Sequence, residues 1–288
     1  MGPLSPIKLV WGKIRGVFTP ESGVVLEMPR FFTNIILDFG KVIKKGLIIM
    51  AEDIKARLSF GATAAEQAAI DEGLRAYMLK VYNYMASGVA LSGIVAALMA
   101  SSPSLMQAIY GTGLHWVVML APLGFILVLS FGVHKLSATA TQALFWAFAA
   151  VMGASLSWIL LAYTGASIAR VFFITTATFG AMSLYGYTTK RDLTGMGTFM
   201  FMGLIGIIIA SIVNIFMASS ALDFAISVIG VLVFVGLTAY DTQKIRNMYF
   251  EADSTEVATK KAVMGALTLY LDFINLMLML LRLFGERR

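Results

Sequence analysis

The chain has 288 residues, of which 59% are apolar and 13% are charged. Soluble domains are about 45–50% apolar and about 25% charged, so a soluble globule of this length could not bury so much apolar surface. The absence of cysteine excludes disulfide scaffolds, thiol nucleophiles and cysteine-held clusters. Two histidines, His115 and His134, are too few for a multi-histidine metal site. The composition predicts an integral membrane protein.

The first 49 residues mix apolar and basic residues. Apolar positions recur among lysines at helical spacing: Phe31, Ile35, Phe39, Ile43 and Leu47. This pattern is typical of a helix lying on an anionic membrane surface. An appended or alternative N-terminus fits equally well, because Met50 would serve as a start of its own. Residues 50–77 are expected to form a cytoplasmic segment, without a secretory signal.

Long stretches without Asp, Glu, Lys or Arg follow, separated by short polar or turn-rich segments. A helix needs about 20 apolar residues to cross the hydrocarbon core of a bilayer. Seven such spans are expected, near 78–100, 114–133, 142–163, 167–188, 198–218, 224–243 and 262–281. The sequence therefore predicts an all-α, seven-transmembrane-helix bundle over 78–285.

The loop charges predict how this bundle is oriented. Three connections carry Lys or Arg: 134–135, 190–192 and 244–261. The loops on the opposite side carry none: 101–113, 164–167 and 219–222. The positive-inside rule then places the N-terminus in the cytoplasm. Arg282, Arg287 and Arg288 run against this pattern, and a re-entrant seventh span would return the C-terminus to the cytoplasm.

Two aspartates lie inside the spans, where a carboxylate is costly and indicates a functional site. Asp272 lies midway along the seventh span, on the same face as Thr268 and Asn275. Asp241 follows Tyr240 near the cytoplasmic end of the sixth span. Straight counting places Asp241 roughly 10 Å closer to the cytoplasm than Asp272. Contact between them would need helix tilt or a deeper sixth span. A protonated Asp272 bonded to a neighbouring helix, and an Asp241 that simply reaches water, are the structural alternatives.

Three motifs occur in order and together resemble the Bax inhibitor-1 family, in particular its bacterial YccA-type members. They are YGYTTKRDL (185–193), AYDTQKI (239–245) and LTLYLDFINLMLMLLRLFG (267–285). The resemblance covers about 75–285. It implies a bundle with a central seventh helix ringed by the other six, in the bacterial inner membrane. It also implies a pH-sensitive calcium leak and a role in stress responses.

The resemblance assigns the proton sensor and gate to Asp241 and Asp272. It also implies a basic latch for Asp241 near the end of the second span, where family members carry arginine. This span has no arginine, and Lys135, beside His134, lies nearest that position. Lysine offers a point charge where arginine offers a bidentate fork, so the two are not equivalent.

Two carboxyl groups close together in a low dielectric do not both ionise readily, and they titrate as a unit. A shared proton would hold the two helices together, whereas two charges would separate them and attract calcium. Calcium prefers several oxygen ligands. The pair, supported by Asn275, Thr268 and Tyr240, is expected to bind calcium transiently as a permeant ion.

The resemblance also implies an alternative function, a non-conducting regulatory adaptor of a membrane-bound AAA protease or of a stress response. A retinal protein is disfavoured because residues 262–281 contain no lysine for a Schiff base. No nucleophile triad or metal-ligand spacing appears in the spans, so no enzymatic activity and no resident cofactor are expected. The expected partners are the bilayer, protons and calcium. Nucleic acid is not expected, because the basic residues lie in short runs between apolar spans.

Overall fold

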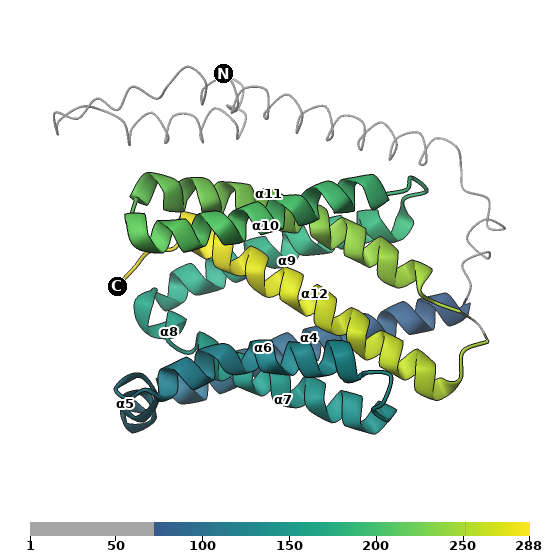
Figure 1. Ribbon diagram of the computed structural model, residues 1–288, viewed down its shortest axis with the longest axis horizontal. Coiled ribbons are helices and arrows are strands. Elements are labelled where there is room, and N and C mark those ends of the chain that lie inside the picture. Colours follow the sequence, from purple (N-terminus) through teal and green to yellow (C-terminus); the bar gives the residue numbers. More distant parts are fainter. Residues whose placement is uncertain (1–71, 251) are drawn as a thin grey trace, which may run out of the picture. The chain divides into compact units, whose positions relative to one another are not determined.

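A computed structural model of the protein describes residues 72–250 and 252–288, and over these ranges the chain is helical, without a β-strand (Figure 1). The predicted extension, residues 1–49, lies outside the described residues. The same holds for residues 50–71 of the predicted cytoplasmic segment. The helices are α4 (Glu72–Ala100), α5 (Pro103–Tyr110), α6 (Leu114–Gly132), α7 (Ala138–Leu156), α8 (Ile159–Ala162), α9 (Gly165–Thr188), α10 (Thr194–Met217), α11 (Ser220–Asn247) and α12 (Thr255–Phe284).

In the part of the chain that the structure describes, seven helical segments are long and apolar enough to cross a membrane when α7 and α8 are taken together. The predicted all-α, seven-helix architecture is therefore confirmed. Several helices begin before the predicted spans, because their first turns are polar and the spans were predicted from apolar sequence. Four of them begin at a Ser or Thr whose side chain accepts a hydrogen bond from the backbone N–H three residues on: Ser137, Thr164, Ser219 and Ser254.

Helix α12 is the central helix, as the family resemblance implied. In the most apolar 18-residue stretch of α12, 67% of the stretch is buried inside the bundle, whereas the corresponding share for α10 is 6%. It packs against α4, α7, α9 and α11, and it runs obliquely to α10 and α11 (Figure 1). Helix α6 packs chiefly on α7, and α10 packs chiefly on α11. Of the six helices expected to surround α12, four contact it directly, and α6 and α10 lie outside these four.

The middle of α12 is fixed by aromatic packing against α7 and by one buried hydrogen bond to α4. The Tyr270 ring meets Phe148 edge-on at 5.2 Å between centroids and Phe145 at 6.5 Å. Its hydroxyl lies 2.6 Å from Ser92 Oγ on α4. Buried Tyr side chains need such a partner for the hydroxyl, so this contact also fixes the rotation of α12.

The end of the chain after α12 is fastened to the connection between α8 and α9. Thr164 N donates to Glu286 O and Arg288 N donates to Ala162 O, each at 3.0 Å. The guanidinium of Arg287 lies 5.9 Å from the centre of the Tyr163 ring. Helix α12 is continuous, so the seventh span is not re-entrant.

The C-terminal arginines that run against the loop-charge rule therefore have local partners. Arg282 Nη1 lies 3.6 Å from Asp223 Oδ1 at the start of α11. Arg287 lies over Tyr163, as described above. These contacts explain basic residues at the end of the bundle whose other loops carry none.

Candidate functional site

The structure brings Asp241 of α11 and Asp272 of α12 together. Their carboxyl groups lie within hydrogen-bonding reach of one another. A hydrogen bond between two carboxyl groups needs a proton on one of them. The arrangement is therefore suited to holding a single shared proton.

Straight counting separated the two aspartates in depth, and the helix geometry removes this separation. Lys261 Nζ donates to Met248 O at 3.0 Å, which sets the end of α11 level with the second turn of α12. From that level Asp272 lies about 16 Å along α12, and Asp241 lies about 10 Å back along α11. The oblique course of α12 and the length of the Lys261 side chain account for the remaining difference (Figure 1).

The two carboxyl groups have unequal surroundings. Asp272 is 5% exposed, and its Oδ2 has no hydrogen-bond partner among the described residues. Asp241 is half-buried and interacts electrostatically with the ammonium group of Lys244, one helical turn further along α11. The buried carboxyl therefore offers an oxygen free for a proton or a cation, while the other is nearer a basic group.

The predicted supporting residues do not bond to the carboxyl pair. Thr268 Oγ1 donates to Met264 O, and Asn275 Nδ2 donates to Leu271 O, so both side chains bond to their own helix. Tyr240 packs against the start of α10, where a side chain at Gly197 would collide with its ring. Lys244 Nζ lies 6.0 Å from the centre of the same ring.

Lys135 and His134, the predicted latch, follow α6, whose main neighbours are α7 and α5. The structure shows no hydrogen bond or ion pair between either side chain and another described residue. It does not bring Lys135 to Asp241, whose basic neighbour is instead Lys244. The latch assignment rests on counting along one helix, and counting does not show which helix that residue faces.

A cluster of hydroxyl groups beside the pair was not predicted. Tyr82 of α4 and Thr242 of α11 both bond to Ser183 of α9, with oxygen–oxygen distances of 2.7 Å and 2.9 Å. Thr242 directly follows Asp241, so this cluster fixes α11 against two other helices at the level of the carboxyl pair. Thr242 belongs to one of the sequence motifs and could have indicated this cluster, but its partners lie in spans that are distant in the sequence.

The first two sequence motifs, 185–193 and 239–245, also contact one another in the structure. Gln243 of α11 accepts from Leu193 N at 2.9 Å and donates to Arg191 O at 2.7 Å. Arg246 donates to the carbonyl of Thr189 at 3.3 Å. Gly186 lies against the backbone of Ala239, where a β-carbon would overlap the carbonyl. The loop between α9 and α10 is thus clamped to the end of α11 that carries Asp241.

A third aspartate lies in this clamped loop, outside the spanning helices. Asp192 Oδ1 accepts hydrogen bonds from Thr194 Oγ1 at 2.6 Å and from Thr194 N at 2.9 Å. These bonds, that of the side chain first, hold the pKa of the Asp192 carboxyl below its usual value. Asp192 is fully exposed, and its bonds stabilise the start of α10.

In residues 72–250 and 252–288, no three His, Cys, Asp or Glu side chains lie close enough together to hold a metal ion. The carboxyl pair therefore supplies two acidic ligands at most. A cation there would complete its coordination with carbonyl, amide or water oxygens, which is typical of weak calcium binding.

Comparison with known proteins decides the family. The family model described as Inhibitor of apoptosis-promoting Bax1 matches residues 74–288. The chain belongs to the Bax inhibitor-1 family. This confirms the resemblance carried by the three motifs, and the match includes both aspartates.

Bacterial members of the Bax inhibitor-1 family are similar to this chain over most of their length. An uncharacterized protein of Rickettsia prowazekii is 53% identical over 78% of this chain and 96% of its own. The inner membrane protein YbhL of Escherichia coli K12 is 50% identical over 75% of this chain and 94% of its own. An uncharacterized membrane protein of Streptococcus pyogenes is 38% identical over 75% and 95%. These relatives and the seven apolar helices support a multi-pass protein of the inner membrane.

Proposed function

We propose that this Bax inhibitor-1 family protein is a pH-gated calcium leak, with Asp241 and Asp272 as its proton sensor and gate. The observation that carries the proposal is the contact between the two carboxyl groups at the buried α11–α12 interface. Acidic groups inside a membrane bundle are costly to stability, and they typically occur on ion or proton pathways.

The direction of gating follows from the charges. With one shared proton, the pair carries a single negative charge, and its hydrogen bond holds α11 against α12. With both groups ionised, two negative charges repel one another at close range in a low dielectric, where repulsion is strong. The proposal therefore has the leak closed at low pH and increasingly open as the pH rises.

Calcium is the permeant ion and not a resident cofactor in this proposal. The ionised pair supplies hard oxygen ligands and a negative charge. Asn275 lies one turn from Asp272 and uses its amide nitrogen on Leu271 O, which leaves its amide oxygen as a further acceptor. A site with so few protein ligands binds weakly, and weak binding suits passage better than storage.

The test is calcium flux into proteoliposomes, measured against pH. The wild-type flux is expected to rise with pH. Asp272→Asn keeps the shape of the side chain but removes its ionisable proton, so this variant is expected to fold and to lose most of the pH dependence. Asp241→Asn is expected to weaken the response, and the double variant should add little, because coupled groups titrate as a unit.

The matched control is Asp223→Asn, which removes a carboxylate from the opposite end of α11, where it pairs with Arg282. Its pH profile should equal that of the wild type. An Asp272→Asn variant with the wild-type pH profile would contradict the gate. Wild-type protein without calcium flux at any pH would contradict the leak and favour the adaptor function.

A further inference from the structure

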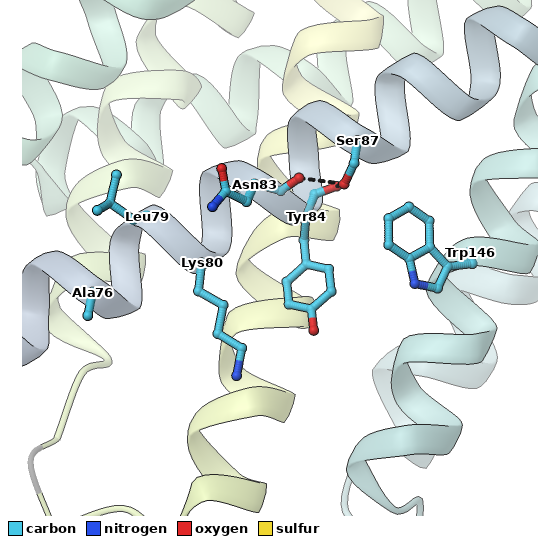
Figure 2. A pocket seen from close by; sticks show the side chains of 7 residues that line it. All are labelled: Ala76, Leu79, Lys80, Asn83, Tyr84, Ser87 and Trp146. Carbon is cyan, nitrogen blue, oxygen red and sulfur yellow. Dashed lines mark hydrogen bonds between the residues drawn. The ribbon is translucent and has the colours of Figure 1, made fainter.

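A groove on α4, beside α7, carries a lysine that has no acidic partner among the described residues. It has a volume of about 450 Å³ and is lined by Ala76, Leu79, Lys80, Asn83, Tyr84, Ser87 and Trp146. The six α4 residues follow one another at helical spacing and so form one stripe of that helix. Figure 2 shows Lys80 and Tyr84 projecting from α4 in the same direction, with Trp146 of α7 beside Tyr84.

The charge of Lys80 has no acidic partner in the described part of the chain. Its Nζ donates one hydrogen bond, to Thr259 Oγ1 of α12, at 2.7 Å. An ammonium group carries more donors than this single bond uses. The Asn83 amide is exposed and has no side-chain hydrogen bond to another described residue, so it is a second available donor.

The depth of the groove corresponds to the headgroup region. Helix α4 has 29 residues and is about 43 Å long, which exceeds the roughly 30 Å hydrocarbon core. Lys80 lies about 12 Å from the start of α4, near the boundary between headgroups and acyl chains. Tryptophan is enriched at this boundary, and lysine extends its ammonium toward it.

The apolar part of the lining suits an acyl chain. Leu79 is 51% exposed, and Ala76 is also exposed, so the stripe that carries Lys80 faces lipid. The Tyr84 ring, held by a hydrogen bond from Gln142, and the Trp146 indole form the side of the groove toward α7. A phosphate at Lys80 and Asn83 would leave the attached chain against these apolar surfaces.

We propose that this groove binds one anionic phospholipid from the leaflet at the N-terminal end of α4, with its phosphate at Lys80 and Asn83. Charge complementarity selects the occupant, because the groove opens toward lipid and its cation has no carboxylate partner in residues 72–250 and 252–288. The site is independent of the carboxyl pair, so it stands or falls separately from the calcium leak.

The test is native mass spectrometry of the purified full-length protein with added phosphatidylglycerol or phosphatidylcholine. The wild type is expected to retain one phosphatidylglycerol in preference to phosphatidylcholine. Lys80→Gln should bind it about fivefold more weakly, the loss expected for one basic residue near an anionic headgroup. Lys190→Gln, which removes an exposed charge from the α9–α10 loop, should bind like the wild type.

Two further variants separate lipid binding from packing. Thr259→Val removes the hydrogen bond of Lys80 to α12 but keeps the charge, so lipid retention is expected to persist. Lys80→Arg also keeps the charge and serves if Lys80→Gln fails to fold. An unchanged affinity in Lys80→Gln, or an equal loss in Lys190→Gln, would overturn the proposal. Displacement of the lipid by excess inorganic phosphate would show a free-anion site and would also overturn it.

Discussion

Lys244 is the basic residue whose charge interacts with Asp241, one of the two carboxyl groups of the proposed gate. A nearby positive charge favours the ionised carboxylate. Without Lys244, the pair should keep its proton to a higher pH.

We therefore expect Lys244→Gln to move the pH at which calcium flux rises upward by about half a pH unit. Exposed ion pairs contribute less than about 1 kcal/mol, and one pH unit corresponds to about 1.4 kcal/mol. Calcium flux in proteoliposomes measures the shift. Lys135→Gln is the matched control, and a shift of the flux profile in that variant instead would restore the predicted latch.

Asp192 gives a prediction that concerns stability and not flux. Its folded-state pKa lies below the ordinary value because Thr194 donates to the carboxylate. The stabilisation is therefore present above the pKa of the unfolded state and is lost as the pH falls through the folded pKa.

Asp192→Ala should lower the melting temperature at neutral pH by a small amount, and the difference should vanish in acid. Melting of the two proteins in detergent, from neutral pH to below about pH 3, measures this. A difference that persists at the lowest pH would show that the loss is one of packing and not of the charged hydrogen bonds.

At the residue scale, the sequence identified the two aspartates because an acidic residue in an apolar span is conspicuous. It did not identify Tyr82, Ser183 or Ser92, because hydroxyl residues are common in membrane helices. Their role becomes apparent only when their hydrogen-bond partners are known. The partners lie in other spans, and only the packing of the helices shows which spans meet.

At the scale of the elements, Gly186 allows α9 to approach α11 closely, two residues before Asp241 on α11. A β-carbon at this position would overlap the Ala239 carbonyl, whereas one at Gly180 of the same helix would meet nothing within 4 Å. Backbone cannot yield as a flexible side chain does, so the two glycines should respond differently to the same change.

Gly186→Ala is expected to cost about 3 kcal/mol, the upper part of the range for overpacking. Gly180→Ala should leave stability unchanged or slightly higher, because alanine favours the helix. Thermal unfolding in detergent compares the two variants. Equal melting temperatures would show that α9 and α11 separate at no cost.

The helices themselves were largely predictable, since each predicted span overlaps a helix of the structure and differs mainly at its ends. The differences have one cause. Charge-free sequence marks the part of a helix that lies in hydrocarbon, but α12 begins at Thr255, and its first turns are polar. The oblique course that brings Asp272 to Asp241 could not be predicted, because tilt is set by packing against other helices.

At the scale of the whole molecule, seven membrane crossings would place the start of α4 and the end of α12 on opposite sides of the membrane. The absence of cysteine makes this directly testable. Two single-cysteine variants report on the two sides. Lys190→Cys changes the loop between α9 and α10, and Arg288→Cys changes a residue after α12, beside the α8–α9 connection.

Lys190→Cys should react with a membrane-impermeant maleimide in inverted vesicles and not in intact cells, because the positive-inside rule predicts that the basic loops face the cytoplasm. Arg288→Cys should show the reverse pattern. The cysteine-free wild type is the blank. Labelling of both variants from the same side would contradict the seven-crossing topology.

The central helix is also synthesised after the other six crossings described above. The first six crossings must therefore wait in the bilayer with Ser92 still lacking Tyr270, and with Lys80 still lacking Thr259. Helices that are each stable in lipid can insert first and associate later, so the bundle closes only after α12 has entered the membrane. A chain interrupted before α12 would leave the surfaces of α4, α7, α9 and α11 that pack on this helix without their partner.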